Sequence, residues 1–295
     1  MKIIMIGHGM VGHKFIESVL EHVGDDVEIT ILAEEPRLAY DRVHLTEYFS
    51  GKSAKDLTLC RADFADAYGI DLRLNTKAVA IDQSHKTVTT NHGDVLSFDK
   101  LILATGSYAF VPPISGNDRE NCFVYRTIED LDAIRAASLN AKSGVVIGGG
   151  LLGREAAKAL RDLNLETHVV EFAPRLMAVQ IDDLGGKVLR AKIENLGVKV
   201  HTQKATSSIE EGATTKHVMK FGDGSELETD IILFSAGIRP RDELARQSGL
   251  ALGERGGIMI NDYCQTSNPD IYAIGECALW QNNIYGLVAP DYAMA

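Results

Sequence analysis

The sequence predicts an α/β fold with two parallel β-sheets, each flanked by helices and each accompanied by a short antiparallel meander. Three observations lead to this prediction. A Gly-x-Gly-x-x-Gly motif follows an apolar run at residues 7–12 and again at residues 148–153. Each motif leads into a helix-like stretch and then into a second strand pattern with an acidic residue. Each half returns to an apolar strand, and this order of apolar strands and crossovers is typical of parallel sheets covered by helices.

The first half opens with the stretch MKIIMIGHGMVGHKFIESVL. An apolar strand is expected up to Ile6, followed by a turn with Gly7, Gly9 and Gly12 and then a helix. One such motif is weak evidence in a chain with 27 glycines among 295 residues. The pattern continues with a strand expected at residues 28–38, short strands around 71–74, 77–81, 87–90 and 95–98, and a return strand at 99–106.

The second half repeats this order, which makes the motif far more specific. The strand before Gly148, Gly150 and Gly153 leads into the helix-like stretch EAAKALRDL. A second strand is expected at residues 166–176, short strands around 198–202, 207–210, 217–221 and 226–228, and a return strand at 230–237. Two matching units in one chain predict two dinucleotide-binding domains.

The three glycines of each motif suit a diphosphate for separate reasons. The first allows the tight turn, the second leaves room for the pyrophosphate against the backbone, and the third lets the helix pack close to the strand. Free N–H groups and the positive end of the helix dipole then hold the phosphates.

An acid follows each motif at the spacing at which carboxylates accept hydrogen bonds from ribose hydroxyls. Glu34 lies 22 residues after Gly12, and Glu171 lies 18 residues after Gly153. A carboxylate at Glu171 would repel a 2′-phosphate, which favours NADH over NADPH at the second site. Arg175 leaves this choice open, because it could contact a phosphate instead of lying in solvent.

Composition excludes several other functions. The formal net charge is −11, and no cluster of Lys and Arg provides the basic surface that nucleic-acid binding needs. The acidic balance suits plain solubility, or basic redox partners. The chain shows no signal peptide and no apolar run of membrane-spanning length, so a cytoplasmic protein without membrane contact is expected.

These motifs resemble those of the pyridine-nucleotide-dependent flavoprotein reductases with the glutathione-reductase fold. Ala104-Thr105-Gly106 resembles the A-T-G turn of that family, and residues 237–240 resemble its G-x-R-P stretch. Residues 266–276 resemble its second FAD motif, with Glu276 where Asp is usual. The resemblance implies an FAD domain split around an NAD(P)H domain: residues 1–112 and 246–295 for FAD, and residues 113–245 for NAD(P)H, with the chain stopping before an interface domain.

Within that family the whole chain resembles the amino-terminal region of NADH-dependent nitrite reductase large subunits. The stretches EEPRLAYDRVHL, GGGLLGREAA and FSAGIRPRDEL carry this resemblance. It implies an oxidoreductase of nitrate assimilation in which NADH gives a hydride to FAD. Electrons would then pass to iron–sulfur and sirohaem centres in downstream domains or a small subunit, which are the expected partners.

The resemblance also implies the site residues. The expected FAD contacts are Gly7, Gly9, Met10, Gly12, Glu34 or Glu35, Arg42, Val79, Thr105, Gly106, Arg126, Gly275, Glu276 and Leu287. The expected NADH contacts are Gly148, Gly150, Leu152, Gly153, Glu171 and Gly237, with Glu155 near the junction of flavin and nicotinamide as the candidate catalytic residue. No metal site is expected, because His8 and His13 have no further ligand at a suitable spacing.

One departure from the family leaves alternatives open. Disulfide reductases of this fold carry cysteines where this chain has Tyr40-Asp41-Arg42-Val43-His44-Leu45-Thr46-Glu47, so electrons cannot leave through a thiol there. The chain could therefore also be a stand-alone reductase of a rubredoxin or ferredoxin. If the expected truncation weakens FAD binding, it could be a nucleotide-binding fragment without turnover.

Overall fold

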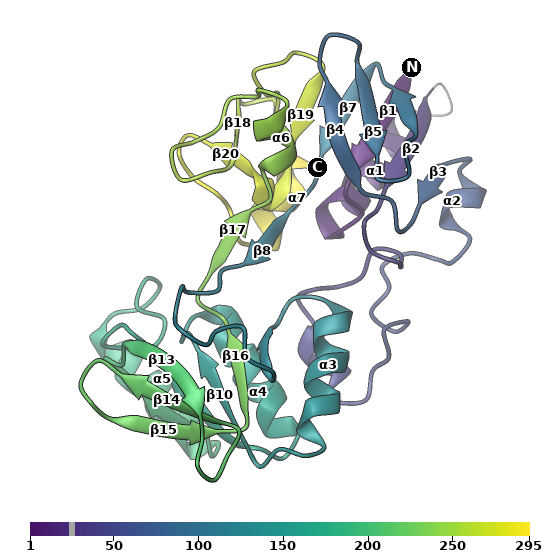
Figure 1. Ribbon diagram of the computed structural model, residues 1–295. Coiled ribbons are helices and arrows are strands. Elements are labelled where there is room, and N and C mark those ends of the chain that lie inside the picture. Colours follow the sequence, from purple (N-terminus) through teal and green to yellow (C-terminus); the bar gives the residue numbers. More distant parts are fainter. Residues whose placement is uncertain (24–26) are drawn as a thin grey trace. The chain divides into compact units, whose positions relative to one another are not determined.

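The computed structural model describes residues 1–23 and 27–295, which form two compact units (Figure 1). The first unit comprises Met1–Asp41, Leu57–Tyr108 and Arg239–Ala295, and the second comprises Arg42–Asp56 and Ala109–Ile238. The chain leaves the first unit for the second through β8 (Ser107–Ala109) and returns through β17 (Ile238–Pro240). The boundaries expected after residues 112 and 245 separate an FAD-binding domain from an NAD(P)H-binding domain. Which ligand each part binds is not tested by the compact units, so these boundaries stay a prediction.

The first unit is built on a parallel sheet of five strands. Its strand order is β19-β7-β1-β2-β3, so β1 (Lys2–Ile6) lies at the centre, between β2 (Glu28–Leu32) and β7 (Lys100–Leu103). The outer strands are β3 (Asp71–Arg73) and β19 (Ile271–Ala273). All pairings are parallel, which explains why the central strands are apolar on both faces.

The two faces of this sheet bury different partners. One face packs against α1 (Met10–Val23) and α2 (Phe64–Ala67), with Ile16 and Phe64 in its core. The other face packs against the meander β4 (Ala78–Asp82), β5 (Thr87–Thr90) and β6 (Val95–Ser97) and against α6 (Glu243–Gln247). The unit also contains β18 (Ile258–Ile260), η3 (Gly275–Cys277), β20 (Ala278–Trp280) and α7 (Val288–Met294).

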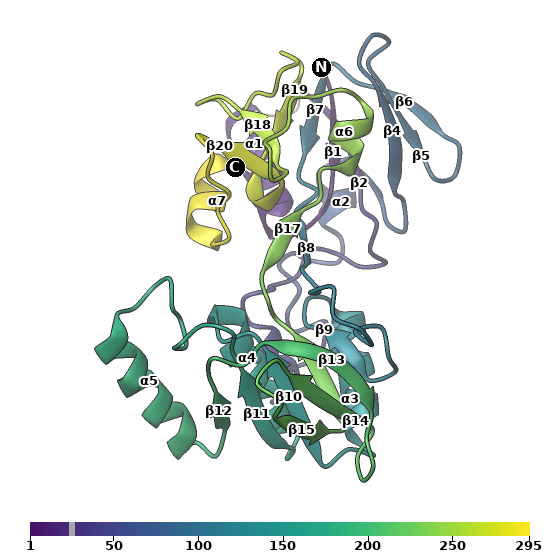
Figure 2. The same cartoon turned by 60° about the vertical axis from the view of Figure 1, so that its left-hand side comes forward.

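The second unit repeats the architecture of the first. Its parallel sheet has the order β12-β11-β10-β16-β9, formed by β9 (Cys122–Val124), β10 (Ser143–Ile147), β11 (Glu166–Val170), β12 (Lys199–His201) and β16 (Ile231–Phe234). Figure 2 shows α4 (Leu151–Asp162), which packs on β10 and β11, beside this sheet. The meander consists of β13 (Thr206–Glu211), β14 (His217–Phe221) and β15 (Glu226–Thr229), and its apolar side chains pack against the sheet.

Three more helical segments complete the second unit: η2 (Leu45–Tyr48), α3 (Ile128–Ser138) and α5 (Asp183–Asn195). Helix α3 begins at a capping box, in which the Thr127 hydroxyl accepts the Asp130 N–H and the Asp130 carboxylate accepts the Thr127 N–H. No helix in residues 1–23 or 27–295 combines the length and the apolar character needed to cross a membrane.

The predicted α/β class, with two Rossmann-like parallel sheets and two meanders, is confirmed. The strands expected around residues 71–74 and 198–202 differ from the prediction in one respect. They join the parallel sheets as β3 and β12, each beside the second strand of its unit, instead of belonging to the meanders. The strands expected at 28–38 and 166–176 end earlier, at Leu32 and Val170, and the acidic residues lie in the loops beyond.

Candidate functional site

The turn between β1 and α1 is closed tightly around two of its three glycines. Gly7 has a φ of +105°, and a Cβ there would lie 2.2 Å from the carbonyl oxygen of Ala104. A Cβ at Gly12 would lie 2.5 Å from the carbonyl oxygen of Gly7. At Gly9, by contrast, a Cβ would meet no heavy atom within 4 Å. The middle glycine therefore faces open space at the amino end of α1, and the amino end of a helix favours an anion.

The turn between β10 and α4 has the same geometry. Gly148 has a φ of +119°, and a Cβ there would lie 2.2 Å from the carbonyl oxygen of Ser235. A Cβ at Gly153 would lie 2.0 Å from the carbonyl oxygen of Gly148, whereas at Gly150 it would meet nothing within 4 Å. In each turn, the first and third glycines of the motif thus admit no side chain, and the middle one lies beside open space.

Glu171, directly after β11, lies against the second of these turns. Its two carboxylate oxygens accept the N–H of Gly149 at 2.6 Å and the N–H of Ala173 at 2.7 Å. Among the contacts of the described residues, backbone N–H groups alone therefore fix this carboxylate beside the glycine turn. Each oxygen retains a lone pair that can accept a further hydrogen bond.

Glu34 lies in the loop after β2 and has a different environment. Its carboxylate pairs with Lys77 Nζ at 3.2 Å and accepts a hydrogen bond from the Arg241 guanidinium. Partial burial alone would raise the pKa of Glu34, but the hydrogen bonds and charges of Arg241 and Lys77 lower it below its ordinary value. The neighbouring carboxylate of Glu35 accepts the Tyr40 hydroxyl at 2.8 Å.

Other expected FAD contacts gather at the carboxyl edge of the first sheet. Thr105 and Gly106 follow β7, and Gly275 and Glu276 follow β19, the strand beside β7. The Thr105 hydroxyl donates to the carbonyl of Arg241 at 2.6 Å, and the Ser107 hydroxyl donates to Glu276 at 2.7 Å. Ligands of open α/β sheets bind beyond this edge.

The remaining expected FAD contacts are more dispersed. Met10 begins α1, the half-exposed Val79 lies on β4, and the exposed Leu287 precedes α7. Arg42 and Arg126 belong to the second unit, where Arg42 Nη1 donates to the carbonyl of Arg126 at 3.0 Å. Their roles as flavin contacts stay a prediction.

The expected NADH contacts of the second unit lie on α4 and after β16. Leu152 and Glu155 lie in the first half of α4, and Gly237, with a φ of +111°, follows β16. Burial raises the pKa of Glu155, and the charges of Arg154 and His44 partly oppose this shift. Glu155 therefore holds a proton more readily than an exposed glutamate does.

Three polar residues near these sites escaped the sequence analysis. Lys77 and Arg241 contact Glu34, but a single lysine or arginine in a loop carries no motif. Asp291 on α7 is only 3% exposed, and burial together with the charge of Glu276 raises its pKa to about 7. An aspartate in the middle of a short helix gives no sequence signal of such burial.

Two buried histidines flank the first glycine turn. The rings of His8 and His13 have centroids 5.6 Å apart, and both pack around Phe64. Burial and the neighbouring His13 lower the pKa of His8 to about 4, so the imidazole is neutral at pH 7. Over the ranges 1–23 and 27–295, no group of three or more His, Cys, Asp or Glu side chains is arranged to hold a metal ion.

Comparison with known proteins agrees with this geometry. The chain is 55% identical over its full length to the nitrite reductase (NADH) large subunit of Escherichia coli and covers 35% of that protein. It is 56% identical over 99% of its length to the nitrite reductase [NAD(P)H] large subunit of Klebsiella oxytoca and covers 31% of it. The chain thus spans about a third of the length of these relatives.

A solved structure shares the fold over almost the whole chain. The water-forming NADH oxidase from Lactobacillus brevis, bound to NADH, matches with a TM-score of 0.89 at 25% identity, covering 99% of this chain and 67% of the oxidase. The family model for pyridine nucleotide-disulphide oxidoreductases matches residues 1–291. The chain belongs to the pyridine nucleotide-disulphide oxidoreductase family.

Proposed function

We propose that this chain is the NADH-oxidising flavin module of an assimilatory nitrite reductase. The observation that carries the proposal is the pair of glycine turns, each closed at its first and third glycine and open at the middle one. Only a ligand that lies against the backbone at Gly9 and Gly150 makes use of this arrangement. The high identity to nitrite reductase large subunits supports the same reading.

The residues present fit FAD in the first unit and NADH in the second. Backbone N–H groups at the starts of α1 and α4 would hold the two diphosphates, while Glu34 and Glu171 would accept hydrogen bonds from the adenosine riboses. Glu276 would bind the ribityl chain. When bound, FAD supplies the ring system that accepts a hydride from NADH.

The side chains of this protein would then position the ligands and control protons. Glu155 would help to orient the nicotinamide, and its raised pKa would let it hold a proton more readily than an exposed glutamate does. Residues 40–47 contain no cysteine, so the chain offers no thiol there that could take up electrons. The downstream acceptors would therefore be the iron–sulfur and sirohaem centres of further domains or of a small subunit.

Contacts in the second unit favour NADH over NADPH. A 2′-phosphate would have to approach the carboxylate of Glu171, which would repel it. Arg175, the residue that could have held such a phosphate, is already engaged: it donates to Asp183 at 2.7 Å, to the carbonyl of Ile181 at 3.0 Å and to the carbonyl of Ala178 at 3.1 Å. Three of the five N–H donors of this guanidinium are thus already used within residues 175–183, which favours a structural role for Arg175.

A substitution of Glu171 tests this preference. Glu171→Ala should weaken NADH binding roughly 10-fold through loss of a charge-assisted hydrogen bond and leave NADPH binding equal or stronger. Titration of each nucleotide against the intrinsic fluorescence gives both affinities. An unchanged ratio of the NADH and NADPH affinities in Glu171→Ala would contradict the assigned role.

The electron transfer itself is tested by anaerobic mixing with NADH. The protein loaded with FAD should lose its yellow flavin absorbance at about one NADH per flavin, as expected for a two-electron transfer. A loaded protein that stays yellow in excess NADH would contradict the proposal. A protein that takes up no FAD at all would support the alternative, a nucleotide-binding fragment without turnover.

The acceptor is tested by competition. Because residues 40–47 contain no cysteine, a rubredoxin or ferredoxin remains a second candidate acceptor. Reduction of rubredoxin, of a dye and of separately produced sirohaem domains should be compared at equal concentrations. Preference for the sirohaem domains supports the nitrite reductase assignment, and preference for rubredoxin supports the alternative. A cytoplasmic location fits either role and stays a prediction.

A further inference from the structure

Glu34 stands in the loop after β2, two residues beyond the end of that strand. The backbone on either side of it is held by β3 and by the loop that follows β3. The Thr76 N–H donates to the carbonyl of Ala33 at 2.8 Å, and the Asn75 N–H donates to the carbonyl of Glu35 at 3.2 Å. Asn75 adopts a left-handed φ of +52°, which turns the loop so that both N–H groups point at residues 33–35.

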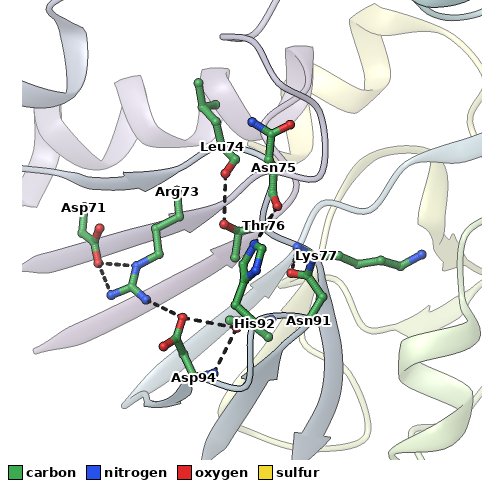
Figure 3. Close-up of polar contacts among 10 residues, drawn as sticks. Asp71, Arg73, Leu74, Asn75, Thr76, Lys77, Asn91, His92 and Asp94 are labelled. Carbon is green, nitrogen blue, oxygen red and sulfur yellow. Dashed lines mark hydrogen bonds and ion pairs between the residues drawn. The ribbon is translucent and has the colours of Figure 1, made fainter.

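The loop after β3 is itself held by the turn between β5 and β6 (Figure 3). Asn91 binds Lys77 twice: its Oδ1 accepts the Lys77 N–H at 2.8 Å, and its own N–H donates to the Lys77 carbonyl at 2.8 Å. His92 Nε2 donates to the carbonyl of Asn75 at 3.0 Å. Lys77 then pairs with Glu34 through its ammonium group at 3.2 Å. A chain of contacts therefore runs from the meander turn to the acid.

Charged residues brace the outer side of this turn, as Figure 3 also shows. Arg73 pairs with Asp71 at 2.8 Å and with Asp94 at 3.4 Å, and the Arg73 carbonyl accepts the Ala33 N–H at 2.9 Å. The Thr90 hydroxyl accepts the N–H groups of His92 and Asp94, both at 3.2 Å. The turn is thus also fixed by contacts that do not depend on the side chains of Asn91 and His92.

We propose that Asn91 and His92 are positioning residues for the adenosine ribose of FAD, because they hold loop 74–77 against the segment that carries Glu34. This inference rests on the proposed binding of FAD in the first unit. Neither side chain would touch the flavin. Their contribution would be to keep the Glu34 carboxylate where it can accept hydrogen bonds from the ribose.

The second unit contains a corresponding turn, which provides a matched control. There the Lys204 N–H donates to the carbonyl of Glu171 at 3.1 Å, and the Gly222 N–H donates to the carbonyl of Ala205 at 2.9 Å. The Lys204 ammonium group binds the side chain of Asp223 at the tip of the meander. Asp223→Ala therefore disturbs the same kind of contact in the other unit.

The experiment compares Asn91→Ala and His92→Ala with Asn91→Asp and His92→Gln. The second pair keeps the acceptor at Asn91 and a donor near the position of His92 Nε2. FAD affinity is measured by flavin fluorescence, ADP affinity by displacement of FAD, and folding by the melting temperature without ligand. ADP carries the adenosine ribose but no flavin, so it reports on the Glu34 side of the site alone.

Each alanine variant should raise the dissociation constants of FAD and ADP by the same factor, roughly 5- to 30-fold, as expected for the loss of one or two hydrogen bonds. The conservative variants should restore both affinities, and Asp223→Ala should leave FAD affinity unchanged. Wild-type affinities for FAD and ADP in both alanine variants would overturn the inference. So would a lower melting temperature without any change in affinity. A wild-type chain that binds no FAD would instead refute the proposed function.

Discussion

The two units form the same glycine turn but differ by one residue in where the acid follows the second strand. In the first unit Gly7 donates to the carbonyl of Leu32, and in the second Gly148 donates to the carbonyl of Val170, so these strand ends correspond. Glu171 follows its strand end directly. The corresponding residue of the first unit is Ala33, and the acid comes one position later. The two spacings, 22 and 18 residues, both fit the motif, but they conceal two different geometries.

The position of the acid determines what the glycine turn can carry. At Gly149 a Cβ would lie 2.5 Å from a side-chain carbon of Leu176 and 3.0 Å from a carboxylate oxygen of Glu171, so no side chain fits there. The corresponding residues of the first unit are His8, in place of Gly149, and the small Ala33, in place of Glu171. Moving the acid one residue along the loop removes one reason for a glycine at this point and leaves space for an imidazole.

The two acids also differ in what holds them. Backbone N–H groups of Gly149 and Ala173 fix Glu171, whereas two flexible cationic side chains, Lys77 and Arg241, contact Glu34. Exposed pairs of this kind contribute little to stability by themselves. We infer that the backbone contacts around Glu34, and not the ion pairs, do most of the positioning.

The largest expected effect comes from filling the open space at each middle glycine. Gly9→Val and Gly150→Val place side chains where the protein has no atoms within 4 Å, so both variants should fold normally. Gly9→Val should weaken FAD binding at least 100-fold and spare NADH, and Gly150→Val should do the reverse, because a branched side chain occupies the diphosphate position. Separate titrations of FAD and NADH measure this.

The control for this pair is the melting temperature, which should stay close to that of the wild-type chain. If either variant lost both ligands, or neither, the assignment of one dinucleotide to each unit would be wrong. Gly153→Ala offers a contrast, because its Cβ would lie 2.0 Å from the backbone oxygen of Gly148. That variant should lose stability as well as affinity for NADH.

The second-largest expected effect concerns His8, which lies in the first glycine turn at the position that Gly149 occupies in the second turn. In the folded chain its pKa is about 4, against an ordinary value of 6.5, so the unfolded chain binds this proton first as the pH falls. The stabilisation of the folded chain that comes from the neutral His8 ring is complete above about pH 6.5 and is lost as the pH falls from 6.5 to about 4. The loss amounts to roughly 3 kcal/mol at most.

Urea unfolding at pH 7 and pH 4.5 tests this prediction with His8→Asn, which cannot titrate. The variant should lose less stability than the wild-type chain on acidification. His22→Asn is the control, because His22 lies exposed in the last turn of α1. An equal loss in the wild-type chain and in His8→Asn would show that other groups, such as His13, dominate the acid response.

Much of this architecture could be predicted from the sequence, because its signals are local. Glycines at fixed offsets after apolar strands have one structural use, and their repetition identified both turns and the order of the main strands. The short strands that form β3 and β12 were expected, but their place in the parallel sheets was not, since three-residue strands carry no periodicity that separates a parallel edge from a meander. The contacts of Lys77, Asn91 and Arg241 depend on loops that approach each other only after folding.

The smallest expected effect isolates the ion pair at Glu34. Lys77→Met keeps the apolar stem and removes the charge, while both backbone contacts of Lys77 with Asn91 remain possible. Because the ammonium group and the carboxylate are both about half exposed, the free energy of unfolding should fall by less than about 1 kcal/mol at low salt, and the difference should vanish near 1 M salt. Denaturant titrations at the two salt concentrations measure it. A loss well above 1 kcal/mol that persisted in high salt would mean that charge, and not the backbone of loop 74–77, holds the first acid in place. The two units would then differ in that ion pairs hold Glu34 whereas backbone N–H groups hold Glu171.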